Sequence, residues 1–453
     1  MEDTIAAIST PIGEGGIAII RVSGPRAFNI ADAVFISKRA RPSTFPTHTI
    51  HFGWIGDQGY SVDQVMLSVM RAPRTYTSED TIEINCHGGT LNARSILSLC
   101  LMHGARLAEP GEFTKRAFLN GRLDLTQAEA VMDLIHARTS RAQSAATHAL
   151  EGHLSKKIEQ ARDLLLGIVA HIEAHIDFPD DVIDDGTRDS WLNGTLHVLS
   201  FVQELLRTTR EGKILRHGFA VTIVGRPNVG KSSLMNALLG EERTIVTPIP
   251  GTTRDTIEEY ANINGIPVKL TDTAGLRKAR GTVEAIGIAR SRKSLARSDL
   301  LLHILDGSRA FSAEDRRLLN LCGKKPVLHV VNKSDLPQKL RLPADFAHGD
   351  RLRVSATHGE GLLELKKAIE SAALSSLNGP CDLDVVVNER QFDALRRAND
   401  YVTCGLEDLK GGAACELVSQ QLRLGLSAMG EVVGKTATED ILSKIFSTFC
   451  IGK

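Results

Sequence analysis

The first 118 residues alternate short apolar runs with glycine and proline. Runs of this length between such residues are typical of strands, and the clearest are TIAAIS, GIAIIRVSG, VDQVMLSVM and TIEINCHGG. The longer LNARSILSLCLMHGA has the length and periodicity of a helix. We therefore predict an N-terminal α/β or α+β domain over residues 1–118.

The apolar spacing then becomes helical, and we assign residues 119–215 to a helical domain. One stripe of apolar positions, three or four residues apart, follows a long predicted helix: Leu154, Ile158, Ala161, Leu165, Ile168 and Ile172. FPDDVIDDG (178–186) ends this helix with a proline and an acidic run. That run is either a metal site or a solvated connection to the helical stretch that follows to about residue 212.

Residues 216–376 return to short apolar runs, most of them separated by helical segments: FAVTIVG, IPVKLTD, DLLLHILD and KPVLHVVNK. This alternation predicts a parallel sheet with crossover helices. The Asn-Gly pair in NINGIPV predicts a hairpin, so one edge of the sheet is expected to be antiparallel. The helical pattern resumes over 377–453, which indicates that the α/β unit is inserted in a helical domain built from both flanks.

Composition narrows the class of protein. At 453 residues the chain exceeds what one core supports, so we expect two to four domains. Lys plus Arg and Asp plus Glu each total 54, so nucleic-acid binding must rest on local patches. The seven cysteines show no CxxC pair or zinc spacing. With no signal-peptide pattern and no apolar run of membrane-spanning length, these features predict a soluble cytoplasmic protein.

GRPNVGKS (225–232) lies between a predicted strand and a predicted helix, as a phosphate-binding loop does. Its glycines let backbone N–H groups close on phosphate oxygens, and the start of the helix adds partial positive charge. Lys231 is expected to reach the outer phosphates, and Ser232 the magnesium ion.

Further segments complete a nucleotide site in the expected order. Thr253 and Asp272 are placed to complete the Mg²⁺ shell, and the Gly275 N–H to face the γ-phosphate. Asn332–Asp335 follows a strand, where open α/β sheets bind ligands, and its carboxylate can accept two hydrogen bonds from guanine but not from adenine. Ser355-Ala356 can bring a backbone amide near the guanine O6.

These segments resemble the GTP-binding domains of the translation-factor-related GTPases and predict a Ras-like GTPase domain. The predicted GTP-binding residues are Asn228, Val229, Gly230, Lys231, Ser232, Ser233, Thr247, Pro248, Ile249, Pro250, Gly251, Thr252, Thr253, Asp272, Thr273, Ala274, Gly275, Asn332, Lys333, Asp335, Ser355 and Ala356.

One part of the usual switch is missing. Ras-type enzymes place a glutamine after Asp-x-x-Gly to orient the attacking water, whereas this chain has Leu276. Leucine neither donates nor accepts a hydrogen bond, so another group must supply charge and orient water. Asn228 suggests one answer, because its side-chain oxygen could hold a monovalent cation against the phosphates.

With GRPNVGKS, TPIPGTTRD, DTAGLR and a terminal FCIGK, the chain resembles the MnmE (TrmE) family of bacterial tRNA-modification GTPases. The resemblance extends through GGIAIIRVSG, GEFTKRAFLNGRLDLTQAEAV and HIDFPDD. It implies that Glu284 orients the catalytic water; without it, this glutamate would be interpreted as a solvated helix residue. It also implies that both Glu284 and a K⁺ ion act when two GTP domains meet, with the ion bound by Asn228, Thr247, Ile249 and Thr252.

The resemblance further implies that the N-terminal domain binds folate and forms a constitutive homodimer. The residues expected to contact 5,10-methylene-tetrahydrofolate, or a formyl-tetrahydrofolate analogue, are Arg21, Glu83, Arg122 and Lys453. A carboxylate suits the pterin edge, and Arg and Lys suit the glutamate tail; from the sequence alone these are surface charges. The implied reaction is one-carbon transfer to C5 of the wobble uridine of tRNA, which installs an aminomethyl or carboxymethylaminomethyl group. The flavin-dependent MnmG (GidA) is the implied partner, in a heterotetramer or larger assembly.

Other interpretations stay open at this point. Gly13–Gly16 (GEGG) either matches the GxxG of an RNA-binding KH module or forms a turn between strands. Cys450 is a nucleophile or a buried, inert thiol. A regulatory GTPase in ribosome assembly would have a similar GTP domain, but neither flank shows the basic RNA-binding module it would carry. A membrane-remodelling GTPase is disfavoured because no basic amphipathic anchor is present.

Overall fold

The computed structural model describes residues 3–37, 40–57, 59–178, 185–240, 259–272, 295–322, 325–343, 351–375, 385–436 and 438–453. The chain forms two compact units. The first comprises Met1–Met132, Leu150–Arg188 and Cys404–Lys453, and the second Asp133–Ala149 and Asp189–Thr403. Within the described residues, no helix is both long enough and apolar enough to cross a membrane.

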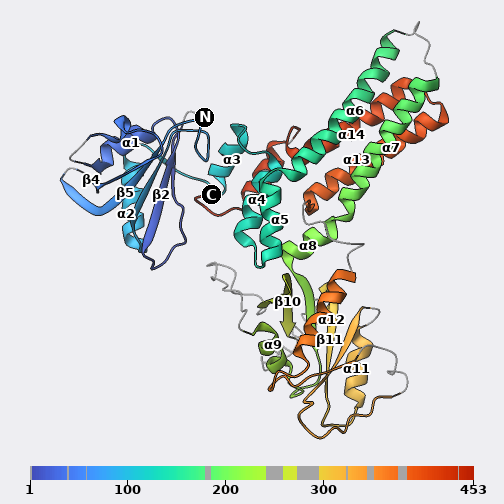
Figure 1. Ribbon diagram of the computed structural model, residues 1–453. Helices are drawn as coiled ribbons and strands as arrows, with labels where there is room; N and C mark the ends of the chain where they lie inside the picture. Colours follow the sequence, from blue (N-terminus) through green and yellow to red (C-terminus); the bar gives the residue numbers. More distant parts are fainter. Residues whose placement is uncertain are drawn as a thin grey trace, which may run out of the picture. The chain divides into compact units, whose positions relative to one another are not determined.

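A seven-stranded sheet with two covering helices forms the N-terminal part of the first unit (Figure 1). Its strand order is β3-β4-β5-β6-β2-β1-β7, with β1 Ile5–Ile8, β2 Ile17–Ser23, β3 Phe35–Ile36, β4 Thr49–Asp57, β5 Tyr60–Met70, β6 Thr81–His87 and β7 Arg106–Leu107. All pairings are antiparallel except β1 with β7. Helices α1 (Ala27–Val34) and α2 (Thr90–Met102) bury the apolar core between themselves and the sheet. The predicted α+β domain is confirmed.

Two details of this sheet bear on the sequence predictions. Gly13–Gly16 connects β1 to β2, so GEGG is a turn between strands and not a KH loop. β4 was not predicted; its side chains Ile50, Phe52 and Trp54 are exposed, and Gly53 lies between Phe52 and Trp54 on the buried face. A Cβ at Gly53 would lie 2.4 Å from the Phe35 ring, which explains why glycine is needed there.

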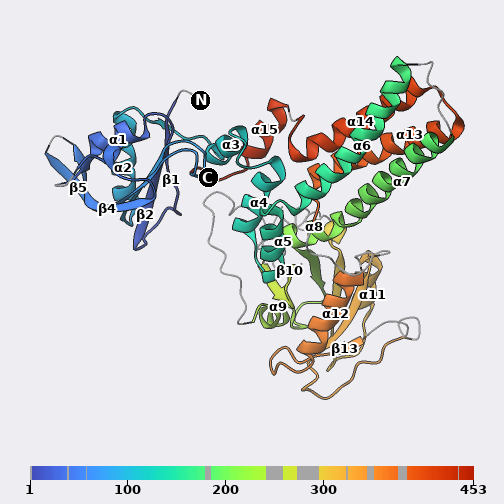
Figure 2. The ribbon, with the colours of Figure 1, turned by 45° about the horizontal axis from the view of Figure 1, so that its top comes forward.

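Helices make up the rest of the first unit, and α6 lies beside α14 in both ribbon views (Figures 1 and 2). Helices α3 Glu112–Leu119, α6 His153–Asp177, α14 Cys415–Val433 and α15 Glu439–Phe446 lie within the first unit. Helix α8 Thr209–His217 lies within the second unit, and four helices have residues in both: α4 Leu125–His136, α5 Ser140–Leu150, α7 Asp185–Arg207 and α13 Glu389–Gly411. α6 buries the predicted stripe with one correction: Ile168 is only half-buried, and Val169 is buried instead. Four residues after Leu165, Val169 keeps to the 3.6-residue period better than Ile168 does.

The second unit contains a six-stranded sheet in the order β13-β12-β11-β8-β10-β9 (Figure 1). The strands are β8 Phe219–Val224, β9 Glu259–Ile263, β10 Ile266–Asp272, β11 Leu300–Asp306, β12 Val327–Asn332 and β13 Arg351–Arg353. Helices α9 (Lys231–Leu239), α11 (Ala313–Cys322) and α12 (Leu362–Ser375) belong to the same unit.

The pairing within this sheet follows the sequence prediction. All pairs are parallel except β9 with β10. Between those two strands, Asn264 and Gly265 have φ of 50° and 85°, as a two-residue hairpin with positive φ at both positions requires. The predicted parallel sheet with one antiparallel edge is therefore confirmed.

Candidate functional site

The phosphate loop runs from the end of β8 to the start of α9, as predicted. Asn228 and Gly230 have left-handed φ values of 63° and 96°. A Cβ at Gly230 would lie 2.2 Å from Asn332 Nδ2, so this position requires glycine. Lys231, only 6% exposed, donates from Nζ to the carbonyls of Gly225 at 2.8 Å and Arg226 at 2.6 Å. Its ammonium is thus held against the loop that is expected to bind phosphate.

Two oxygen ligands lie together beside this loop. Ser232 Oγ donates to Asp272 Oδ2 at 3.3 Å, which joins the first turn of α9 to the last residue of β10. Mg²⁺ prefers hydroxyl, carboxylate and water oxygens. The two side chains therefore fit a shared magnesium shell, in which a carboxylate can act directly or through water. No cluster of three or more metal-ligating side chains occurs among the described residues.

Asn332 joins the phosphate loop to a second loop. Its Nδ2 donates to the Val229 carbonyl at 2.8 Å, and its Oδ1 accepts from the Ala356 N–H at 3.1 Å. Asn332 is 2% exposed, so both bonds are shielded from water. One side chain thus fixes the spacing between the two loops.

Asp335 lies in the segment expected to read the base. Ser355 Oγ donates to Asp335 Oδ1 at 2.6 Å, so the predicted residues at 335 and 355 are in contact. This bond lowers the pKa of Asp335 from its ordinary value. The carboxylate is therefore ionised near neutral pH and can accept hydrogen bonds from two N–H groups of a base.

Asp306, at the end of β11, was not predicted. Its carboxylate is 1% exposed and accepts from Lys333 Nζ at 2.7 Å. Burial would raise the pKa of Asp306, but hydrogen bonds from Lys333 and Ser308 outweigh burial and lower it. The available signal was an aspartate at the carboxyl end of an apolar strand, which is where ligand-binding residues gather in such sheets.

Part of the predicted site lies outside the described residues. This holds for the predicted K⁺ loop, for the switch that contains Leu276 and for the predicted catalytic residue: Thr247, Pro248, Ile249, Pro250, Gly251, Thr252, Thr253, Thr273, Ala274, Gly275, Leu276 and Glu284. Most of the acidic run at 178–186, residues 179–184, also lies outside. Of the remaining GTP-site predictions, Val229 is buried in the phosphate loop and Ser233 is exposed on α9.

A second cluster forms around Tyr76 in the first unit. Arg21 and Arg122 place their guanidinium carbons 5.2 and 4.9 Å from the Tyr76 ring centroid. Arg21 Nη2 lies 2.8 Å from Glu83 Oε1. Burial lowers the pKa of Lys453, with a further contribution from Arg21, while Glu83 opposes it. The four residues predicted to contact folate are thus brought together.

The Tyr76 ring and the chain's last turn make this cluster possible. The Tyr76 hydroxyl hydrogen-bonds Thr114 Oγ1 at 2.9 Å, which fixes the ring, and the Tyr76 carbonyl accepts from Arg122 at 2.8 Å. A Cβ at Gly452 would lie 2.3 Å from the Ile8 carbonyl oxygen, so the last turn packs closely on β1. Cys450 is exposed, so the buried-thiol interpretation is wrong. Tyr76 was missed because a single aromatic residue in a loop has no distinctive pattern.

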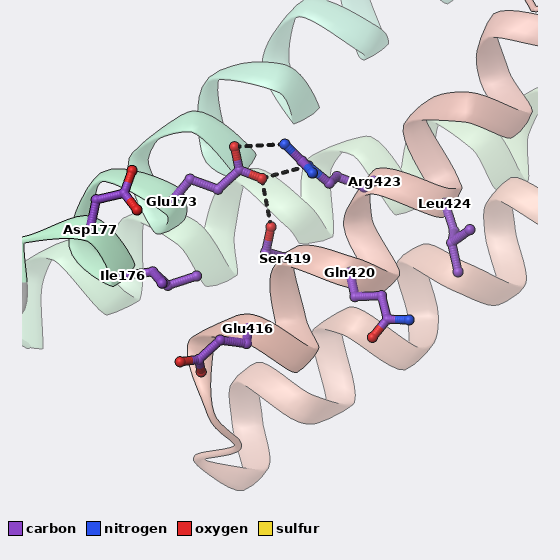
Figure 3. Close-up of a pocket in the computed structure, with 8 residues that line it drawn as sticks. All are labelled: Glu173, Ile176, Asp177, Glu416, Ser419, Gln420, Arg423 and Leu424. Carbon is purple, nitrogen blue, oxygen red and sulfur yellow. Dashed lines mark hydrogen bonds and ion pairs between the residues drawn. The ribbon is translucent and has the colours of Figure 1, made fainter.

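A groove of about 600 Å³ lies along α6 and α14 (Figure 3). Three of its polar residues are joined to one another: Glu173 accepts from Ser419 at 2.9 Å and pairs with Arg423 at 2.5 Å. None of its residues was predicted, and it is remote in sequence from the nucleotide motifs. The groove therefore adds no group to either cluster.

Comparisons with known proteins cover the whole chain. The family model described as "MnmE helical domain" matches residues 125–450, and "GTP-binding protein TrmE N-terminus" matches residues 4–122. The tRNA modification GTPase MnmE of Geobacillus kaustophilus is 46% identical over 100% of this chain and 99% of its own length. That of Bacillus velezensis is 45% identical over 100% of both chains.

Solved structures match a smaller part. Era of Aquifex aeolicus bound to GDP and AlF₄⁻ is 27% identical, with a TM-score of 0.28, over 40% of this chain and 65% of Era. The G domain of FeoB from T. maritima is 29% identical, with a TM-score of 0.26, over 34% of this chain and 97% of that domain. Family membership rests on the family models and on the full-length relatives. By these two comparisons, the chain belongs to the tRNA modification GTPase MnmE family.

Proposed function

We propose that this chain is a GTPase that acts in tRNA modification. The observation that carries the GTPase part is the double bridge of Asn332, at 2.8 Å to Val229 and 3.1 Å to Ala356. It sets the phosphate loop and the base-reading loop at one spacing, and Asp335 beside Ser355 supplies the acceptor for guanine. Family membership supports the tRNA part, since the relatives are named tRNA modification GTPases.

The described residues divide the work of phosphoryl transfer. The N-terminus of α9 and the phosphate-loop N–H groups bind the phosphates, and Lys231 adds a positive charge at the outer ones. Ser232 and Asp272 would hold Mg²⁺, which supplies charge neutralisation when bound. Asp335 and the Ala356 N–H orient the guanine.

Hydrolysis is proposed to depend on K⁺ and on a second copy of the GTP domain. Leu276 removes the usual water-orienting glutamine, and Asn228 lies in the phosphate loop with a carbonyl-bearing side chain. We propose that Asn228, Thr247, Ile249 and Thr252 hold the ion and that Glu284 orients the water. Equal GTP turnover in K⁺ and Na⁺ would contradict this.

The Tyr76 cluster is proposed to bind a tetrahydrofolate one-carbon donor. Two arginines, a lysine and a carboxylate around an aromatic ring suit a planar pterin with an anionic tail. The product would be a modified C5 of the tRNA wobble uridine, formed in the cytoplasm with the flavin-dependent MnmG. The arrangement of these residues supports the folate proposal alone, while the partner comes from the family resemblance.

A homodimer through the N-terminal sheet is also proposed. Ile50, Phe52 and Trp54 alternate along β4 and are 62%, 63% and 46% exposed, and Met66 lies opposite Phe52 on β5. A row of exposed apolar side chains on one sheet face is typical of an interface. A second copy of the same face could cover it.

The test is reconstitution of the reaction. The chain, MnmG, GTP, K⁺, a glycine or ammonium donor, methylene-tetrahydrofolate and undermodified tRNA are combined, and tRNA nucleosides are analysed. We expect a modified wobble uridine that requires both GTP and folate. An unmodified uridine alongside active GTP hydrolysis would contradict the modification part and favour a GTPase without modification chemistry.

A further inference from the structure

Two residues with left-handed backbones are joined across the nucleotide site. Lys333 and Asn228 have φ of 66° and 63°. Asparagine tolerates this region, but it is uncommon for a long side chain such as lysine and costs free energy. Lys333 Nζ donates to the Asn228 carbonyl at 3.1 Å. With the Asn332 bond to Val229, the last residue of β12 and the residue after it hold two consecutive carbonyls of the phosphate loop.

Asp306 holds the lysine that makes this link. It lies directly opposite Asn332 in the parallel pairing of β11 with β12. One carboxylate oxygen accepts from Lys333 Nζ at 2.7 Å, and the other accepts from the Ser308 N–H at 3.0 Å and Oγ at 2.6 Å. Both carboxylate oxygens are therefore fixed, and the oxygen bonded to Lys333 fixes the lysine ammonium in turn.

Charge explains why this arrangement matters. A lysine has a long flexible stem, and its ammonium is strongly hydrated. Lys333 is 28% exposed, so water competes for it. The buried carboxylate offers a charge-assisted bond that a neutral carbonyl cannot match. Without that anion, the ammonium would turn toward water and the bond to the Asn228 carbonyl would weaken.

We propose that Asp306 is a positioning residue for guanine-nucleotide binding, because it holds Lys333 where Lys333 braces the phosphate loop at Asn228. This inference rests on the proposed GTPase function and deepens it. It gives Asp306, which lies outside the predicted GTP-binding residues, a share of the affinity for the nucleotide.

The test compares Asp306→Asn with Arg309→Ala in the full chain, using mant-GDP as the probe. Arg309 is 65% exposed and lies 3.7 Å from the same carboxylate, so its removal is a matched control. We expect Asp306→Asn to weaken mant-GDP binding about tenfold. Arg309→Ala should bind as the unmodified chain does. Equal affinity of Asp306→Asn and the unmodified chain would overturn the inference.

A second background separates positioning from a general structural role. Asp306 acts through Lys333 in this account, so Asp306→Asn should cause no further loss of affinity in a Lys333→Ala chain. The same loss in both backgrounds would contradict the account. If Asp306→Asn does not fold, Ser308→Ala carries the test, with a smaller loss of about twofold expected from a loosened carboxylate; unchanged affinity would then overturn it.

The outcomes also distinguish this inference from the proposed function. If the unmodified chain binds no mant-GDP, both the proposed GTPase function and the role of Asp306 are contradicted. If the unmodified chain binds mant-GDP and hydrolyses GTP, and the Asp306→Asn variant binds mant-GDP equally well, only the role of Asp306 is contradicted.

Discussion

The described nucleotide-site residues follow the carboxyl ends of β8, β10, β11, β12 and β13, one loop after another along a largely parallel sheet. The residues around Tyr76 come instead from β2, β6, the segment after α3 and the last position of the chain. Parallel strands bring the loops at their carboxyl ends to one edge of the sheet, and this does not depend on how distant segments of the chain pack. The Tyr76 cluster needs the chain's end to return to the first strands.

The two regions also handle charge differently. Beneath the nucleotide loops, the parallel sheet buries the carboxylate of Asp306 against the ammonium of Lys333 at 2.7 Å, and it also buries a His303–His329 pair with Nδ1 atoms 3.3 Å apart. Near the Tyr76 cluster, the N-terminal part of the first unit buries a full charge, Arg116, among three carboxylates. We therefore expect the two regions to respond differently to charge removal and to acid.

The largest expected effect is that of removing Arg116. Its side chain is 0% exposed and pairs with Asp3, Glu79 and Glu112 at 2.8, 3.2 and 3.0 Å. Arg116→Ala takes the buried cation from all three carboxylates and leaves Asp3 and Glu112 with only the half-exposed Arg106, so the free energy of unfolding should fall by about 3–5 kcal/mol.

Urea unfolding followed by Trp54 fluorescence, in a Trp191→Phe background, measures this effect in the sheet that contains β4. Arg106→Ala is the matched control: Arg106 pairs with Asp3 and Glu112 but is 45% exposed, so we expect a loss of about 1 kcal/mol or less. Equal losses for the two variants would contradict the distinction between buried and exposed charge.

Acid should weaken the parallel sheet through His303. Burial lowers the pKa of His303 from 6.5 to about 4, so between these values the unfolded chain binds more protons than the folded one. The free energy of unfolding should therefore decrease as the pH falls through this window, by up to about 3 kcal/mol. Hydrogen exchange of the β11 amides, corrected for intrinsic rates, measures the slope. His303→Asn should flatten it, and an unchanged slope in the variant would rule His303 out as its source.

The next largest expected effect is that of Gly230→Ala on nucleotide affinity. The added Cβ meets Asn332 Nδ2 at 2.2 Å, and the backbone φ of 96° is unfavourable for alanine. The added Cβ should displace Asn332, which bridges the two loops. GTP affinity should therefore fall about a hundredfold. Gly167→Ala is the control, because a Cβ at Gly167 would have no atom within 4 Å, and this variant should bind mant-GTP as the unmodified chain does. Tight binding by Gly230→Ala would show that the Asn332 bridge is not needed.

The smallest expected effect concerns the Tyr76 ring. Tyr76→Ala removes the surface on which Arg21 and Arg122 lie, and should weaken 5-formyl-tetrahydrofolate binding about tenfold in calorimetry. Tyr76→Phe keeps the ring and should bind nearly as well as the unmodified chain. Equal binding by both variants would mean that the ring does not organise the arginines.

Local motifs were predictable from the sequence, whereas contacts between distant segments were not. Strand–loop–helix motifs such as 225–232 carry their own local geometry, and so the parallel sheet and its hairpin edge were predictable. The same holds for the placement of Ser232 beside Asp272 and of Ser355 beside Asp335. Tyr76 and Asp306 were not, because their roles depend on which distant residues pack against them. β4 was missed although Ile50, Phe52 and Trp54 alternate along it; alternation does not tell which face of a strand is buried, and here these three residues are exposed.

We propose that GTP hydrolysis at this site uses a bound cation in place of the missing glutamine. The direct measurement is steady-state GTP turnover in K⁺ and in Na⁺ at equal ionic strength, for the unmodified chain and for Asn228→Ala. The account predicts turnover at least about tenfold faster in K⁺ for the unmodified chain, and no difference between the ions for the variant. Equal turnover in the two salts by the unmodified chain would contradict it.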